Sequence, residues 1–450
     1  MDDTIVAPST PQGKGAIAMV RLSGDQALSI AKRLFKPAGK ILPRKATYGK
    51  LYDFEEGSFF DEGILIYYKA PNSYTGEEMV EITCHGNPIV AWRIVELAIK
   101  SGARQANPGE FTYRAFLNGK MDLPRAEAVE ELVEAQSYRG VKLSFSQLEG
   151  GLSKRIETLR EELLNLAILL ETEIEFPEEG ISIDLKEVEK ALKNTKEKIN
   201  SLIALFDRGR QFLEGIKLVL VGKPNVGKSS LFNALLEEER AIVTEIPGTT
   251  RDFLRERIIV KGVPFLITDT AGMNPRPSDE IEKEGMRRAL KLIEEADGVL
   301  FLLDASSPID ESDRALAEIV SNKRKVFVLN KIDLKKVISE EDIKKLGNGH
   351  IIKISAKKRE NLEELTETLW KCFSGTSTQE EIYVNSRQKA FLEGALSHIE
   401  KASEMIRNHE TEEIVAEEIR GAIKSLEEIL GKISSEEILK NIFSRFCIGK

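Results

Sequence analysis

The sequence predicts a mixed α/β and α fold, in which a P-loop domain is inserted into a helical domain that follows an N-terminal α/β domain. Three observations support this fold class. An apolar run at residues 217–221 precedes Gly-Lys-Pro-Asn-Val-Gly-Lys-Ser at residues 222–229, and a helical pattern follows. Charged residues alternate with Leu and Ile at helical spacing over residues 123–212 and again after Thr378. Residues 1–118 mix strand and helix patterns.

The N-terminal domain is expected to span residues 1–118, with strands at 16–22, 62–68 and 79–84 and a helix at 88–100. Three polar residues in or next to this domain could be chemical rather than architectural. These residues are Arg21 at a strand end, Glu81 inside a strand, and Lys120 just beyond the domain. Alternation along its strand turns Glu81 toward solvent or a cleft, and an outward-facing carboxylate with no chemical role is the simpler alternative.

The helical domain is expected in two parts, at residues 119–212 and 375–450, with the P-loop domain between them at 213–374. Glycine and proline are scarce in the helical parts, apart from a break at residues 176–180. An insert held at both ends can push on its host when it changes shape. Two separate helical domains on either side of the insert are the alternative.

The glycine-rich turn at residues 222–229 predicts a phosphate site. Backbone N–H groups converge on an anion only where glycine lets the chain turn tightly. Lys228 would add a positive charge at the β- and γ-phosphates, and Ser229 would bind Mg²⁺. Asp269-Thr-Ala-Gly272 ends another strand pattern and would place Asp269 near Mg²⁺ and Gly272 near the γ-phosphate.

The base specificity follows from two further motifs, Asn330-Lys-Ile-Asp333 and Ser355-Ala-Lys357. The Asp333 carboxylate can accept two N–H groups of guanine, whereas adenine offers no matching pair of donors. The nucleotide is therefore expected to be GTP. The residues expected to bind it are Asn225, Val226, Gly227, Lys228, Ser229, Ser230, Thr244, Glu245, Ile246, Pro247, Gly248, Thr249, Thr250, Asp269, Thr270, Ala271, Gly272, Asn330, Lys331, Asp333, Ser355, Ala356 and Lys357.

Hydrolysis of GTP needs an unusual device, because Met273 stands where a glutamine would orient the attacking water. Asn225 could hold a monovalent cation between the β- and γ-phosphates, although a simple turn residue is the alternative reading. A carboxylate within residues 278–283 would then orient the water. Thr250 is the residue expected to close on Mg²⁺.

Composition excludes several classes of protein. The 450 residues carry a net charge of -9, which disfavours nucleic-acid binding by the whole surface, so any RNA contact must be local or made by a partner. The start of the sequence is acidic and no run approaches a membrane span, so the cytosol is expected. Three cysteines and four histidines favour neither a disulfide framework nor a zinc site. Cys447 near the end fits a prenylation motif badly and is either an ordinary surface thiol or a reactive one.

Taken together, these motifs resemble the bacterial tRNA-modification GTPase family MnmE, also called TrmE. The resemblance rests on residues 222–229, 247–252 and 269–272, and on three further segments at residues 3–7, 116–118 and 447–450. It spans the whole chain and implies an N-terminal domain that binds a tetrahydrofolate derivative (5-formyl or 5,10-methylene) and forms a homodimer. It also implies G domains that dimerise across K⁺ during GTP hydrolysis.

The family works with an FAD-containing partner, MnmG (GidA), in a heterotetramer. Together they add a carboxymethylaminomethyl group to carbon 5 of the wobble uridine of certain tRNAs. For this chain the resemblance implies folate contacts at Arg21, Glu81, Lys120 and Lys450. It implies Mg²⁺ ligands at Ser229 and Thr250, and K⁺ ligands at Asn225, Thr244, Ile246 and Thr249.

The resemblance further implies that Glu282 orients the water and that Cys447 takes part in the modification. Residues 273–278 are one residue longer than the usual family spacing, so Glu280 or Glu284 could replace Glu282. Two other functions are possible for such a chain. A ribosome-assembly GTPase would need a basic RNA-binding domain, and a GTP-gated helical scaffold would leave Arg21, Glu81 and Cys447 without a task.

Overall fold

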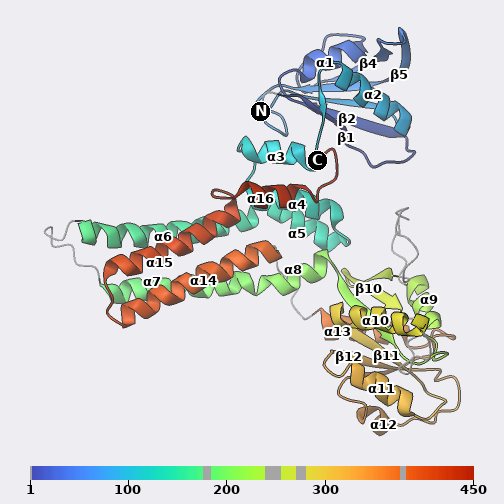
Figure 1. Ribbon diagram of the computed structural model, residues 1–450. Helices are drawn as coiled ribbons and strands as arrows, with labels where there is room; N and C mark the ends of the chain where they lie inside the picture. Colours follow the sequence, from blue (N-terminus) through green and yellow to red (C-terminus); the bar gives the residue numbers. More distant parts are fainter. Residues whose placement is uncertain (1–2, 176–183, 239–254, 270–279, 375–381) are drawn as a thin grey trace. The chain divides into compact units, whose positions relative to one another are not determined.

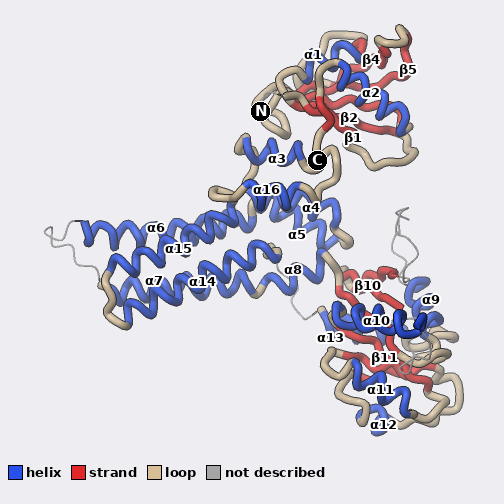
Figure 2. The backbone as a smooth tube through the Cα atoms, viewed as in Figure 1, coloured by secondary structure: helices blue, strands red, loops and turns tan. Residues whose placement is uncertain are grey.

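The computed structural model describes residues 3–175, 184–238, 255–269, 280–374 and 382–450 (Figures 1 and 2). The chain forms two compact units. The first unit consists of Met1–Glu130, Ser146–Asn200 and Arg387–Lys450, and the second of Glu131–Phe145 and Ser201–Ser386. The domain boundaries expected from the sequence stay a prediction. No helix in the described part of the chain is long and apolar enough to cross a membrane.

The first unit begins with a seven-stranded sheet of order β3-β4-β5-β6-β2-β1-β7. Its strands are β1 (Ile5–Pro8), β2 (Ile17–Ser23), β3 (Phe35–Pro37), β4 (Ala46–Asp53), β5 (Ser58–Tyr68), β6 (Met79–His85) and β7 (Arg104–Gln105). All neighbours pair antiparallel except β1 and β7. The three strands expected from the sequence correspond to β2, β5 and β6.

One face of this sheet is covered by α1 (Ala27–Leu34) and α2 (Pro88–Lys100). Helix α2 starts at the expected residue because Asn87 caps it, its side chain accepting the N–H of Ile89, and Pro88 suits the first helical position. Val20 and Ile82 of the central strands pack with Ile94 of α2 in the core. Alternation along each strand therefore sends apolar residues to this face.

The opposite face of the sheet carries a mixture of polar and apolar side chains. Tyr48, Ile64, Thr83 and Met19 are in register across four neighbouring strands. Tyr48 is 50% exposed and Ile64 41% exposed. Within the described residues, this face therefore presents apolar side chains to solvent.

The rest of the first unit is helical. Its helices are α3 (Glu110–Leu117), α4 (Leu123–Glu134), α6 (Gly151–Glu175), α7 (Leu185–Ile203), α14 (Ser386–Arg407), α15 (Glu412–Leu430) and α16 (Glu436–Phe443). Figure 1 shows α6 in green beside α15 in red. Buried residues recur every three or four positions along α6, from Leu152 to Leu170, so each turn contributes a side chain to the core.

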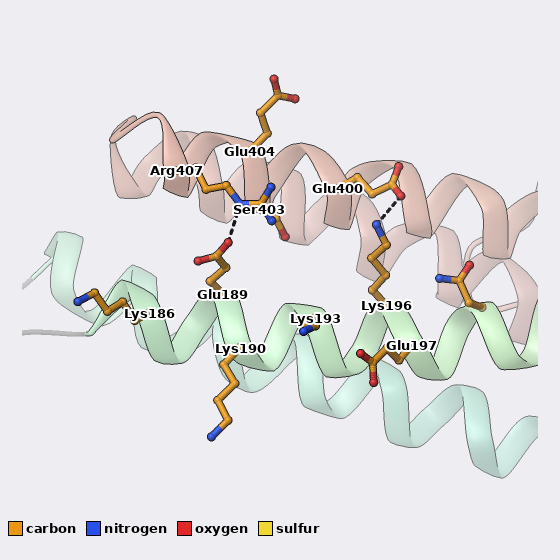
Figure 3. Close-up of a pocket in the computed structure, with 11 residues that line it drawn as sticks. Lys186, Glu189, Lys190, Lys193, Lys196, Glu197, Glu400, Ser403, Glu404 and Arg407 are labelled. Atoms are coloured by element: carbon orange, nitrogen blue, oxygen red, sulfur yellow. Dashed lines mark hydrogen bonds and ion pairs between the residues drawn. The ribbon is translucent and has the colours of Figure 1, made fainter.

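Ion pairs also join helices from the two sides of the insert. Lys196 lies 2.8 Å from Glu400, and Glu189 lies 2.7 Å from Arg407, between α7 and α14 (Figure 3). Exposed pairs of this kind contribute little stability individually, but they show which helices are neighbours. The two halves of the helical domain form one bundle, and the alternative of two separate helical domains is wrong.

A more buried pair joins three helices of the first unit. Arg387 of α14 donates two hydrogen bonds to the Glu127 carboxylate of α4, at 2.6 and 3.0 Å. The same guanidinium donates to the backbone oxygens of Glu428 and Ile429 in α15. A bidentate guanidinium–carboxylate pair fixes both distance and orientation, so it aligns these helix ends.

The second unit contains a six-stranded sheet of order β13-β12-β11-β8-β10-β9. Its strands are β8 (Ile216–Val221), β9 (Arg255–Val260), β10 (Val263–Asp269), β11 (Gly298–Asp304), β12 (Lys325–Asn330) and β13 (His350–Lys353). Its helices are α5 (Tyr138–Leu148), α8 (Leu205–Leu213), α9 (Lys228–Glu238), α10 (Glu280–Glu295), α11 (Glu311–Ile319), α12 (Glu340–Lys344) and α13 (Leu362–Phe373). Among the described strands of this sheet, only β9 runs antiparallel to its neighbour.

Both faces of this sheet are buried, which explains the continuous apolar runs in its sequence. Leu218 and Leu220 of β8 pack into one core, and Val219 and Val221 into another on the opposite face. A central parallel strand needs apolar side chains on both sides, so its sequence does not alternate. The predicted inserted P-loop domain is confirmed as an α/β unit.

We expect Arg387→Met to destabilise the first unit by about 2–4 kcal/mol, because the Glu127 carboxylate would stay buried after losing two charged donors. The free energy of unfolding is measured by urea titration, with the fluorescence of Trp92 as the signal in a Trp370→Phe background. Lys440→Ala is the control, since Lys440 lies 3.9 Å from Glu436 and both side chains are exposed. Equal losses in both variants would contradict a special role for Arg387.

Candidate nucleotide site and a second polar site

The phosphate-binding turn lies at the carboxyl end of β8, between its parallel neighbours β10 and β11. The chain leaves β8 here and enters α9 at Lys228. In open parallel sheets, ligands bind beyond the carboxyl ends of the strands, where neighbouring connections diverge. The predicted loop therefore lies at the edge of the sheet where a nucleotide is expected.

Two glycines are required by the packing of this turn. A Cβ on Gly227 would lie 2.3 Å from Nδ2 of Asn330, and a Cβ on Gly222 would lie 2.6 Å from the Leu302 oxygen. Gly227 also has φ +96°, and Asn225 has φ +64°, a left-handed conformation that asparagine tolerates. The loop can therefore bring its backbone close to an anion.

Lys228 points its ammonium back into the loop, where Nζ donates to the backbone oxygens of Gly222 (2.7 Å) and Lys223 (2.8 Å). Burial lowers the pKa of this ammonium, while the charge of Asp269 opposes the change. Among the described residues, this buried ammonium donates its hydrogen bonds to carbonyl oxygens, so it would gain strongly from an incoming phosphate. The position of Lys228 is what a phosphate site requires.

The residues around Ser229 fit a magnesium ion. Ser229 Oγ lies 3.4 Å from Oδ2 of Asp269, at the end of the neighbouring strand. Oδ1 of Asp269 is buried and accepts no hydrogen bond from any described residue. Burial raises the pKa of this carboxyl, with Lys228 and Ser229 opposing. A hydroxyl beside an unsatisfied carboxylate oxygen is the donor set that Mg²⁺ prefers.

Asn330 connects the phosphate loop to the segment at residues 355–357. Its Nδ2 donates to the Val226 oxygen (2.9 Å), and its Oδ1 accepts the N–H of Ala356 (3.0 Å). The side-chain amide thus makes one hydrogen bond through its nitrogen and one through its oxygen inside the protein. Asn330 braces two loops against each other, and its contact with the base stays a prediction.

The surroundings of Asp333 favour an ionised carboxylate, which can accept hydrogen bonds. Its Oδ1 accepts a hydrogen bond from Ser355 Oγ (2.7 Å), and that hydroxyl accepts the N–H of Lys358 (3.2 Å). The bond from Ser355 is the main cause that lowers the pKa of Asp333, with Lys357 and Lys358 adding smaller contributions. The carboxylate is therefore ionised, as recognition of two guanine N–H groups requires.

The structure also shows a residue that the sequence reasoning missed. Asp304, at the end of β11, pairs with Lys331 Nζ at 2.5 Å. Lys331 itself has φ +65°, so its backbone is turned sharply after β12. Nothing local in the sequence marks Asp304, because it is the cross-strand register that aligns it with Asn330.

Several predicted residues lie outside the described part of the chain. They are Thr244, Glu245, Ile246, Pro247, Gly248, Thr249, Thr250, Thr270, Ala271 and Gly272. Glu282, Glu280 and Glu284 belong to α10, but their side chains also lie outside the described residues. Ser230 follows Ser229 in the first turn of α9.

A second polar site lies in the first unit, on the sheet face that α1 and α2 do not cover. Arg21 and Glu81 are direct partners across β2 and β6. The Arg21 guanidinium donates to Oε1 of Glu81 at 2.8 and 3.0 Å, and Tyr68 Oη donates to Oε2 at 3.0 Å. Glu81 is only 9% exposed, so the alternative of an outward-facing carboxylate in solvent is wrong.

Aromatic rings enclose the guanidinium of Arg21. Its Cζ lies 5.4 Å from the ring centre of Tyr74 and 5.6 Å from that of Phe111. Such rings attract a cation through their π faces. The sequence reasoning missed both aromatics as well as Tyr68, because nothing local in their sequence marks them.

Lys120 lies against the segment that carries Tyr74. Its Nζ donates to the Pro71 oxygen at 3.0 Å, and its side chain passes Gly76, where a Cβ would be 3.3 Å away. Asn118 Nδ2 donates to the Thr75 oxygen at 2.7 Å. Lys120 is therefore linked to the Arg21 site through residues 71–76 and does not contact Glu81 directly in any hydrogen bond that the described residues form.

Residues 447–450 reach the same site. The Gly449 oxygen accepts hydrogen bonds from Arg21 Nη1 (3.4 Å) and Ser9 Oγ (3.2 Å). The Lys450 oxygen accepts the N–H of Phe111 at 3.1 Å. Cys447, which is exposed, belongs to this segment. The structure thus brings together Arg21, Glu81 and Lys450, which the sequence analysis grouped only through the resemblance.

Comparison with known proteins gives a consistent result. The family model "MnmE helical domain" matches residues 123–447, and "GTP-binding protein TrmE N-terminus" matches residues 4–120. Among solved structures, the chain is similar to Era of Aquifex aeolicus bound to GDP and AlF4⁻, at 28% identity over 40% of this chain and 66% of that chain. The TM-score is 0.29.

Curated relatives match along the full length. A tRNA modification GTPase MnmE from Thermotoga maritima is 46% identical over 457 residues, covering 100% of both chains. One from Aquifex aeolicus is 47% identical over 454 residues, again covering 100% of both. One from Thermoanaerobacter pseudethanolicus is 42% identical, covering 100% of this chain and 99% of the relative. The chain therefore belongs to the MnmE family of tRNA modification GTPases.

Proposed function

We propose that this GTPase adds a carboxymethylaminomethyl group to carbon 5 of the wobble uridine of certain tRNAs, together with an FAD-containing partner, MnmG. The one-carbon unit would come from a tetrahydrofolate derivative, 5-formyl or 5,10-methylene, and the reaction would take place in the cytoplasm. The observation that carries the proposal is the pair of Arg21 and the buried Glu81, which forms a second polar site in the same chain as the nucleotide site. A GTP-gated scaffold would have no use for it.

The chemistry of the second site suits a folate. Its Glu81 carboxylate could accept N–H groups of the pterin ring, and the rings of Tyr74 and Phe111 could contact the planar ring system. Lys120 and Lys450 would bind the negatively charged end of the ligand. Cys447 would stand in the same segment as Lys450, where a thiol could take part in transfer of the carbon unit.

Hydrolysis would use a potassium ion in place of an arginine. Asn225 is exposed at the turn of the phosphate loop and could offer its amide oxygen to K⁺, with Thr244, Ile246 and Thr249 as further ligands. Ser229 and Thr250 would hold Mg²⁺. The Glu282 carboxylate would orient the attacking water.

Features of the surface support the proposed partners. The exposed apolar side chains of Tyr48 and Ile64 on the open sheet face support a homodimer through the N-terminal domain. Two copies would join the FAD-containing protein in a heterotetramer. A chain of net charge -9 would contact tRNA through a limited surface or through that partner.

We expect K⁺ to accelerate GTP hydrolysis about tenfold or more over Na⁺ at matched ionic strength, because the cation neutralises charge that develops between the phosphates. Asn225→Gly should lose this activation, since glycine suits φ +64° and only the amide is removed. Steady-state phosphate release measures both rates. Equal rates of the unmodified protein in the two salts would exclude the potassium mechanism.

We expect Asp333→Asn to weaken GTP binding about 100-fold and to favour xanthosine triphosphate, because an amide N–H matches the extra oxygen of xanthine and opposes the guanine donors. Titration with fluorescent analogues of the two nucleotides measures the change. Ser355→Ala is the comparison, as it removes only the hydroxyl that supports Asp333 and should keep the preference for GTP. Unchanged discrimination in Asp333→Asn would show that another residue reads the base.

We expect the chain to bind 5-formyl-tetrahydrofolate, and Arg21→Met to weaken this binding about tenfold or more, because Glu81 would lose its charged donor. Isothermal titration calorimetry measures the affinity. Arg93→Met, which breaks a pair with Asp53 elsewhere in the same domain, is the matched control. Absence of folate binding by the unmodified chain would favour the GTP-gated scaffold.

A further inference from the structure

Residues 447–450 dock on the N-terminal domain through their backbone. The Gly449 oxygen receives hydrogen bonds from Ser9 Oγ and Arg21 Nη1. On either side of it, the Cys447 oxygen accepts the N–H of Gly109 (3.4 Å), and the Lys450 oxygen accepts the N–H of Phe111 (3.1 Å). Because three carbonyl oxygens are held, the path of the segment depends on its backbone conformation.

That conformation is open only to glycine at position 449. Gly449 has φ +98°, which strains residues that carry a Cβ. A Cβ there would lie 2.1 Å from the Pro8 oxygen and 3.0 Å from Ser9 Cα. Both atoms belong to the backbone of β1 and its end, so they cannot move aside as a flexible side chain would.

The contact also holds the guanidinium of Arg21 from two sides. Nε and Nη2 donate to Glu81, whereas Nη1 donates to Gly449. A ligand that requires this arrangement of Arg21 and Glu81 would bind more weakly if the segment left. By linkage, such a ligand would in turn favour the docked segment.

We propose that Gly449 is a positioning residue of the Arg21–Glu81 site, and that docking of residues 447–450 is coupled to binding of the one-carbon ligand there. The coupling rests on the proposed folate function, whereas the docking does not. Gly449 would act through Arg21 and would not touch the ligand. Ser9 is the second positioning residue, because its hydroxyl holds the same carbonyl oxygen.

Amide hydrogen exchange measures, without any ligand, whether residues 447–450 are docked. Phe111 lies in the first turn of α3, where amide N–H groups have no partner within the helix, so its protection depends on Lys450. In Gly449→Ala we expect faster exchange of the Gly109 and Phe111 amides. Calorimetry with 5-formyl-tetrahydrofolate should show affinity lowered about tenfold, as expected for loss of a hydrogen bond to a charged group.

Two variants serve as controls. Gly57→Ala places a Cβ at a positive φ of 69° in the same domain, but in open space, so it tests the backbone strain alone and should change neither readout. Ser9→Ala removes one donor to Gly449 without adding volume and should give a smaller change in both readouts. If Gly449→Ala does not fold, Ser9→Ala alone tests whether docking of the segment is coupled to ligand binding. Ser29→Ala, which removes an exposed hydroxyl of the same domain, is its match.

The outcomes are distinct. Faster exchange together with weaker binding in Gly449→Ala and Ser9→Ala, but not in their controls, supports the proposal. Native exchange and native affinity in both variants overturn it, and faster exchange with unchanged affinity overturns the coupling. If the unmodified chain binds no folate derivative, the proposed folate function and the coupling fail together, while the exchange rates still decide whether Gly449 positions the segment.

Discussion

The first unit depends on the pairing of helices that lie on opposite sides of the insert in the sequence. Arg387 and Glu127 are 260 residues apart, yet their side chains form a bidentate ion pair. The same pairing packs α6 along α15. Bringing such distant segments together costs chain entropy, which buried apolar faces on both helices must offset. One consequence is that both ends of the inserted G domain are attached to a single bundle, so a change of shape in the insert can act on its host.

In the nucleotide site, one side chain supports two loops. Asn330 follows a buried strand, where its amide braces the phosphate loop against residues 355–357. Asp333, three residues later, accepts a hydrogen bond from Ser355 and is the residue that we propose recognises the base. Lys228 and Asp269 are buried charges with few partners, and such groups are strongly stabilised by a phosphate and a divalent cation. The site is therefore organised for its ligand before the ligand binds.

The second polar site has a different origin. It is assembled from β2, β6, the loop that carries Tyr74, and residues 447–450. The last of these segments is far from the others in sequence, since Gly449 lies 428 residues after Arg21. A guanidinium held by one carboxylate, two aromatic rings and one backbone oxygen has little freedom to move. A site of that kind can orient a planar, charged ligand, and its dependence on the last residues links Cys447 to the same place.

The sequence alone determined the fold class, the phosphate loop and the choice of guanine. Each of these depends on residues that are adjacent in the chain, so backbone conformation and hydrogen-bonding chemistry suffice to predict it. Tertiary structure decided that the two helical parts form one bundle, that Glu81 is buried against Arg21, that Gly449 contacts Arg21, and that Asp304 pairs with Lys331. These features depend on strand register and on contacts between distant segments, which a pattern of neighbouring residues does not contain.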